Sequence, residues 1–125
     1  SVQLRSDLVP VQVGMDQALP CGLLVNEMVS NALKHGFPDG RSGEVCIALQ
    51  PASQEGAWQL RVGDTGVGLP DEFELARQSS MGLQLVSQLC QQIGGTLDVR
   101  SRRGQGAVFT VTFRVDVPAP FVMPA

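Results

Sequence analysis

Three polar side chains on one predicted helix face have the types needed to bind a metal ion and a phosphate. Glu27, Asn31 and Lys34 are spaced four and three residues apart in a stretch of helical periodicity, which places them within a wedge of about 60°. Mg²⁺ takes oxygen ligands from few side chains, and a lysine ammonium neutralises phosphate oxygens. The face therefore suits a Mg²⁺-phosphate site, and a solvated helix face with a Glu27 to Asn31 contact suits the same residues.

A second candidate is Asp64, which lies in VGDTGVGLP, residues 62–70, at the end of an apolar run. An ionised carboxylate only accepts hydrogen bonds, so a buried Asp64 would select a base that presents an N–H, adenine over guanine. Asp-Thr-Gly is also the active-site triplet of aspartic proteases. That alternative predicts a small residue after the glycine and a chain without long helices, whereas Val67 follows here and two helices are predicted.

Periodicity predicts a chain of strands and helices with one irregular segment. Alternation at 2–7 and 9–15 predicts two short strands or one strand interrupted at Pro10. Asp16 is the predicted N-cap of a helix that ends at Gly36. The remaining predicted elements are strands at 44–50 and 57–64, a helix at 81–93, and strands at 96–101 and 107–115. Residues 69–80 have no clear period and are predicted to form a mobile exposed segment. This order predicts an α+β fold, a two-layer sandwich with helices on one face of a mixed, mostly antiparallel sheet.

Composition limits the possible classes of function. The 125 residues are 43% hydrophobic and 17% charged, which suits one globular domain over residues 1–117, followed by a Pro-rich tail at 118–125. The net charge of −3 gives no electrostatic footprint for nucleic acid or for direct contact with an anionic membrane. No apolar run has the length of a membrane span and no leader precedes the domain, so we expect a cytoplasmic location.

Cysteines occur at positions 21, 46 and 90, and the chain has one histidine, His35. An odd count without a C-x-x-C pair argues against both a disulfide framework and a zinc site. All three cysteines are predicted to be reduced core residues. His35, at the end of the first helix, is expected to pack or to line a ligand rather than to catalyse.

Four segments occur in an order that resembles a known ATP-binding domain. They are NEMVSNALKHGFPDG at 26–40, VGDTGVGLP at 62–70, SSMGLQLVSQLCQQIGG at 79–95 and GQGAVFTVTF at 104–113. Together they resemble the N box, G1 box, G2 box and closing strand of the Bergerat or GHKL fold, over roughly residues 8–115. Within that superfamily the chain looks most like the catalytic and ATP-binding domain of sensor histidine kinases of the HWE type.

The resemblance implies roles for the end of the first helix. Asn31 matches the asparagine that ligates Mg²⁺. Glu27 matches a position that either helps to hold the metal or polarises the attacking group. Lys34 matches a residue that reaches toward the phosphates, and His35 matches a ring that lies against the nucleoside.

The glycine-containing boxes acquire roles in the same way. Asp64 matches the acid that accepts a hydrogen bond from the adenine amine, and the glycines beside it let the backbone pass close to the base. Gly82 and its neighbours match the turn whose N–H groups meet phosphate oxygens. The positions expected to contact nucleotide through these boxes are Asp64, Gly66, Gly68, Met81, Gly82 and Leu83.

Two features depart from, or add to, the family pattern. Ala107 follows the closing G-x-G, where threonine is usual, and loss of that hydroxyl costs about 1 kcal/mol of nucleotide binding. Arg77 is a candidate second cation for the phosphates, on a segment expected to close as a lid over ATP.

The resemblance implies an enzyme that uses ATP and Mg²⁺. Such a domain transfers the γ-phosphate to a histidine on a separate dimerisation and phosphoacceptor domain, and indirectly serves a response regulator. The alternatives are a serine kinase of the anti-sigma-factor type with the same fold, and a catalytically silent nucleotide-binding regulatory domain.

Overall fold

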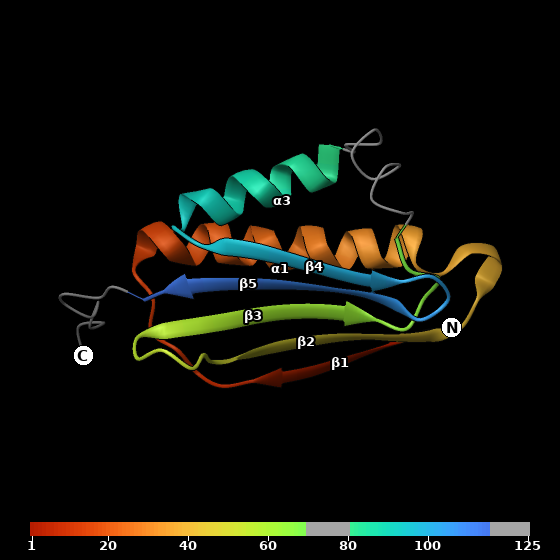
Figure 1. Cartoon of the computed structure of the whole chain (residues 1–125), viewed down its shortest axis with the longest axis horizontal. Helices are drawn as coiled ribbons and strands as arrows, with labels where there is room; N and C mark the ends of the chain where they lie inside the picture. The colour runs from red at the N-terminus through yellow and green to blue at the C-terminus, as the bar shows by residue number, and fades with distance from the viewer. Residues whose placement is uncertain (70–80, 116–125) are drawn as a thin grey trace, which may run out of the picture.

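A five-stranded sheet forms one layer of the fold (Figure 1). The computed structural model describes residues 1–69 and 81–115. The strands are β1 (Val2–Leu8), β2 (Gly43–Pro51), β3 (Ala57–Asp64), β4 (Thr96–Arg102) and β5 (Gly106–Arg114). Their order in the sheet is β1-β2-β3-β5-β4. Only the β1–β2 pair is parallel among these neighbours, so the predicted mixed, mostly antiparallel sheet is confirmed.

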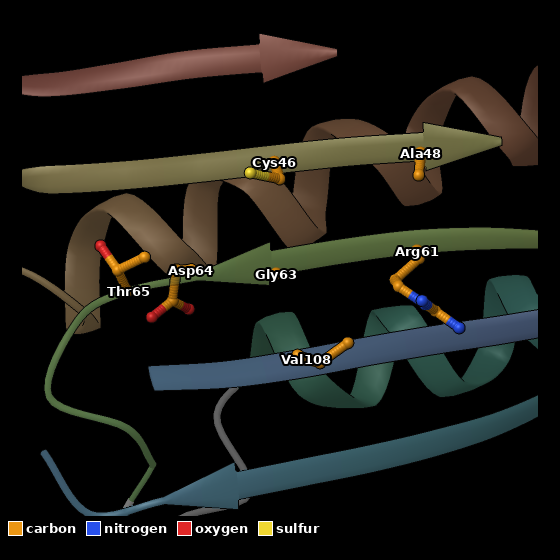
Figure 2. A pocket seen from close by; sticks show the side chains of 7 residues that line it. All are labelled: Cys46, Ala48, Arg61, Gly63, Asp64, Thr65 and Val108. Atoms are coloured by element: carbon orange, nitrogen blue, oxygen red, sulfur yellow. The ribbon is translucent and has the colours of Figure 1, made fainter. Parts of the chain in front are cut away.

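Two helices form the second layer. Helices α1 (Met15–His35) and α3 (Met81–Gln92) pack against each other on one face of the sheet, and both lie behind the strands in Figure 2. A short 3-10 helix, η1 (Pro38–Gly40), follows α1. The α+β sandwich predicted from the element order is thereby confirmed.

The predicted boundaries of α1 are right at one end and wrong at the other. Gly36 is the C-cap, as predicted, and its N–H bonds to the carbonyl of Ala32. The N-cap is Gly14, without a side-chain cap, and Asp16 lies in the first turn. A carboxylate there still meets the partial positive charge of the free N–H groups, so Asp16 favours the helix without capping it.

The N-terminal alternation forms a single strand, so the two-strand prediction is wrong, and the strand does not continue past Pro10. β1 ends at Leu8, and residues 9–14 form no strand. The N–H of Val9 still bonds to the carbonyl of Leu49 at 2.9 Å, but Pro10 has no N–H with which to continue the ladder.

The core lies between the helices and the sheet. Its largest fully buried side chains come from both helices and three strands: Leu24, Met28, Val45, Val62, Val86 and Val111. Along β5 the side chains of 107, 109, 111 and 113 are buried, whereas Val108 and Arg114 are exposed. This alternation means that one face of the sheet packs on the helices and the other meets solvent.

Two predictions about burial are wrong. Cys46 is exposed on the solvent face of β2, whereas Cys90 is buried and Cys21 is half-buried; all three are free thiols. Leu19 and Leu23, which match the apolar period of α1, are 70% and 44% exposed. Burial along α1 instead follows a line that includes Gln17 and Pro20.

Two sequence predictions lie outside the described residues. They are the tail at 118–125 and nearly all of the segment at 69–80, Arg77 included. Within residues 1–69 and 81–115, no helix combines the length and the apolar character needed to span a membrane.

Candidate functional site

Asp64 lies at the end of β3, on the side of the sheet that the helices cover. Its cross-strand partner on β2 is Val45, which is fully buried in the core, and Asp64 itself is half-buried. Its Oδ1 accepts a hydrogen bond from the N–H of Gly66 at 2.8 Å. Oδ2 accepts none from the described residues, so the carboxylate is fixed by one oxygen and offers the other to a donor.

The loop that follows Asp64 packs on the end of α1. The N–H of Val67 donates to the carbonyl of Gly36 at 2.8 Å, and a β-carbon added at Gly66 would overlap that same carbonyl. Gly66 is therefore needed for this close approach of two backbone segments. Because Gly36 directly follows His35, the loop that carries Asp64 and the last turn of α1 form one surface.

Asn31 carries the other unusual polar group near this surface. It is half-buried on α1, and its amide Nδ2 is buried without a hydrogen-bond partner. A buried amide group left unpaired costs about 1–3 kcal/mol, which a bound water or ligand oxygen would offset. Rotation of the amide exchanges its nitrogen and oxygen, so this position suits either a phosphate oxygen or a cation.

Glu27 lies one turn before Asn31 and is also half-buried. No hydrogen bond joins Glu27 to Asn31 in the described part of the chain, so the contact expected for a plain solvated face does not form there. The described residues contain no cluster of three or more His, Cys, Asp or Glu side chains that could hold a metal ion. Two oxygen donors fit Mg²⁺ nonetheless, because this ion keeps several waters and phosphate ligands.

Lys34 and His35 are exposed in the last turn of α1. The ammonium of Lys34 forms no ion pair within the described ranges and is free to meet an anion. His35 is not packed in the core, so of its two expected roles the packing role is wrong and the ligand-lining role stays a prediction.

The start of α3 is the remaining part of the predicted site. The helix begins at Met81, so Met81 and Gly82 belong to its first turn, and the first N–H groups of a helix point out from its N-terminal end. Leu83 is half-buried and packs against the core. A helix N-terminus with this arrangement suits an anion.

Ala107, the departure from the family pattern, is 3% exposed. Its methyl group faces the core side of β5, the same side as Asp64. The preceding residue, Gly106, has φ +94, and a β-carbon there would overlap the carbonyl of Asp64. The closing strand therefore touches the backbone of Asp64 directly.

A hollow of about 260 Å³ lies on the solvent face of the sheet and is lined by side chains of β2, β3 and β5 (Figure 2). Its lining includes Cys46, Arg61 and Val108, all exposed, together with Asp64 and Thr65 at the strand end. No residue of α1 or α3 lines it. Asp64, at the end of β3, therefore borders this hollow as well as the end of α1, whereas Asn31, Lys34 and the start of α3 do not line it.

Sequence reasoning missed the structural part played by Gly36, Gly106 and Ser101. The sequence predicts Gly36 only as a helix stop and Gly106 only as part of the closing G-x-G motif. Nothing in the sequence around Ser101 indicates a role for it. Its position depends on the pairing of β4 with β5, in which Ser101 lies opposite Ala107.

Comparisons with known proteins agree with this arrangement. Residues 16–117 match the family described as histidine kinase-, DNA gyrase B- and HSP90-like ATPase. The chain is 36% identical over 119 residues to blue-light-activated histidine kinase 2 of Erythrobacter litoralis, covering 94% of this chain and 32% of that protein. It is 35% identical over 105 residues to the sensor histidine kinase PdtaS of Mycobacterium tuberculosis, covering 82% of this chain and 20% of that protein.

Solved structures give the same result for the fold. The histidine kinase domain of the Erythrobacter litoralis EL346 blue-light activated histidine kinase superposes with a TM-score of 0.81 at 30% identity, over 91% of this chain and 55% of that chain. The chain spans about a third or less of the length of blue-light-activated histidine kinase 2 and of PdtaS.

Proposed function

The chain belongs to the histidine kinase-, DNA gyrase B- and HSP90-like ATPase family, and from that premise we propose that it is the ATP-binding catalytic domain of a bacterial two-component sensor histidine kinase. It would transfer the γ-phosphate of ATP to a histidine on a separate dimerisation and phosphoacceptor domain, which then serves a response regulator. The domain would act in the cytoplasm, where ATP is supplied. The observation that supports this most is the packing of the Asp64 loop on the end of the helix that carries Asn31.

Asp64 would recognise adenine. Because the N–H of Gly66 holds Oδ1, Oδ2 would be the oxygen that accepts the exocyclic N–H of the base. Guanine would present a carbonyl oxygen there, and two acceptors facing each other without a proton would leave both unsatisfied. Gly66 and Gly68 let the backbone lie close to the base, and His35 would line the nucleoside.

The end of α1 and the start of α3 would hold the phosphates. Asn31 and Glu27 would bind Mg²⁺, which when bound neutralises phosphate charge. Lys34 would place its ammonium against phosphate oxygens, and the N–H groups of Met81, Gly82 and Leu83 would donate to them. These groups position ATP and reduce its negative charge, which is the main requirement of phosphoryl transfer.

In the transfer itself, a ring nitrogen of the acceptor histidine attacks the γ-phosphorus. The new P–N bond forms as the bond from that phosphorus to the β,γ-bridging oxygen breaks, and ADP leaves with the electron pair. Glu27 would polarise the imidazole and orient its N–H, whose proton then passes to the carboxylate or to water.

The test is incubation of the chain with γ-labelled ATP, Mg²⁺ and the histidine-bearing domain of the Erythrobacter relative. We expect label on that domain that is lost in acid and kept in base, as a phosphoramidate bond requires. Label that survives acid and is lost in base would identify a serine kinase. ATP binding without any transfer would identify a silent nucleotide-binding domain.

A further inference from the structure

Ser101, on β4, has been given no role in the site so far, yet it joins two segments that flank Asp64. Its hydroxyl accepts a hydrogen bond from the N–H of Leu69 at 2.7 Å. The same hydroxyl donates to the carbonyl of Gly106 at 3.3 Å. One side chain thus ties the loop after Asp64 to the start of the closing strand.

The loop is held against the β4–β5 turn at a second point. The N–H of Gly104 donates to the carbonyl of Val67 at 2.7 Å. Gly68 allows this approach: its φ is +82, and a β-carbon there would lie 2.5 Å from the carbonyl oxygen of Arg102 and 3.0 Å from the hydroxyl of Ser101. The backbone of the loop therefore packs directly against the backbone of the β4–β5 hairpin.

These contacts form a closed path that includes Asp64. The chain from residue 64 to residue 69 is one part of it, and the hydroxyl of Ser101 connects Leu69 to Gly106. Gly106 in turn packs on the carbonyl of Asp64. The hydroxyl of Ser101 is the side-chain link in this closed path, and it uses both its donor and its acceptor capacity.

We propose that Ser101 is a positioning residue for nucleotide binding: it fixes the loop so that the free oxygen of Asp64 points at the base, without touching the nucleotide itself. The inference rests on the proposed ATP-binding function. Ser101 is exposed, so water replaces its hydrogen bonds when the hydroxyl is removed. The free energy of unfolding then changes little, whereas the loop loses its fixed position, and the effect appears in binding.

The test compares Ser101→Val with Ser101→Thr, which have the same shape and differ in the hydroxyl. The dissociation constant of ATP with Mg²⁺ is measured by calorimetry for both and for the wild type. We expect Ser101→Val to raise the dissociation constant about fivefold, which is equivalent to one net hydrogen bond. The dissociation constant of Ser101→Thr should stay within about twofold of the wild-type value. In the transfer reaction, Val should raise KM for ATP and leave kcat at saturating ATP unchanged.

A control and a local measurement accompany this comparison. Ser6→Val, at an exposed position on the edge strand β1, should leave the dissociation constant unchanged. The ¹H–¹⁵N signal of the Leu69 amide should move in the Val variant and stay near its wild-type position in the Thr variant. Ser101→Ala replaces Ser101→Val if circular dichroism shows that the latter does not fold.

Equal affinity in the Val, Thr and wild-type proteins would overturn the positioning role while leaving ATP binding intact. A fall in kcat at unchanged KM would overturn it as well. Absence of ATP binding in the wild type would overturn the proposed function, and the inference with it.

Discussion

A β-carbon at Gly36 would lie 3.2 Å from Oδ1 of Asp64. The residue that ends α1 is thus in close contact with the carboxylate at the end of β3, although 28 residues separate them in sequence. This contact joins the helix that carries Asn31 and Lys34 to the loop that carries Asp64. To bind one nucleotide, the residues that hold its metal and phosphates and the residue that recognises its base must be held in fixed positions relative to each other.

Gly36→Ala tests whether this contact matters. The added methyl would lie 2.7 Å from the carbonyl oxygen of Ala32 and displace Asp64, so we expect a loss of about 1–3 kcal/mol in the free energy of unfolding and weaker ATP binding. The matched control is Gly22→Ala in the same helix, where a β-carbon meets nothing within 4 Å. That variant should be more stable by up to about 1 kcal/mol. Urea denaturation with equal losses in both variants would contradict the packing described.

Asn31→Ala tests the metal–phosphate face. Loss of the amide removes a ligand of Mg²⁺, and we expect the Mg²⁺-dependent part of ATP affinity to fall about tenfold or more, as for other residues that support metal sites. Asn26→Ala is the control, because Asn26 is exposed on the same helix. Titrations with ATP in Mg²⁺ and in EDTA measure the difference. An Asn31→Ala protein with unchanged Mg²⁺ dependence would rule out the metal role.

Leu24→Ala tests which side of α1 faces the core. Leu24 is fully buried, so truncation should lower the free energy of unfolding by about 2–5 kcal/mol. Leu19→Ala removes the same atoms from a side chain that is 70% exposed, and should change stability by about 0.5 kcal/mol or less. Chemical denaturation distinguishes the two, and a larger loss at Leu19 would reverse the assignment of the helix faces.

The three thiols should differ in reactivity. Burial raises the pKa of the Cys21 and Cys90 thiols above their ordinary value of 9.0, so both stay protonated in the folded protein at pH 8. Cys46 is exposed. Mass spectrometry after a short iodoacetamide treatment should find Cys46 alkylated first, and equal rates at all three positions would contradict the burial described.

The same pKa shifts give a pH dependence of stability. A raised pKa in the folded state means that folding favours the protonated thiol. The contribution to stability from Cys21 and Cys90 is therefore fully present below their unfolded pKa and declines as the pH rises above about 9.

Local chemistry was enough to predict most of the elements and the end of α1. The helix stops at Gly36 because Phe-Pro-Asp-Gly follows it. The β-branched and aromatic residues of β5 indicate a strand. The sequence could not show which apolar residues of α1 are buried. Gln17 takes a buried place because its Nε2 donates to the carbonyl of Arg114 at 2.8 Å, 97 residues away, and no local pattern contains that contact.

The candidate site was predictable where it depends on residue type and only partly where it depends on packing. Residue type and motif are enough to make Asn31, Asp64 and Gly66 candidates, and their roles stay predictions. The contact of Gly36 with Asp64, and the bonds of Ser101 to Leu69 and Gly106, arise from strand register and helix docking. Tertiary contacts of this kind have no signature in a single sequence.

The most direct test of the account is the affinity of Asp64→Asn for ATP. Asparagine has the same shape, and its amide oxygen can still accept the bond from the N–H of Gly66, so the loop should stay folded. Its amide nitrogen, however, would face the adenine amine as a second donor. Calorimetry with Mg²⁺ should show ATP binding to the wild type, weaker binding of GTP, and a loss of about 10- to 100-fold for ATP in Asp64→Asn, the range for a hydrogen bond to a charged group. Equal ATP affinity in the two proteins, or no binding to the wild type, would contradict the assignment of Asp64 as the group that reads adenine.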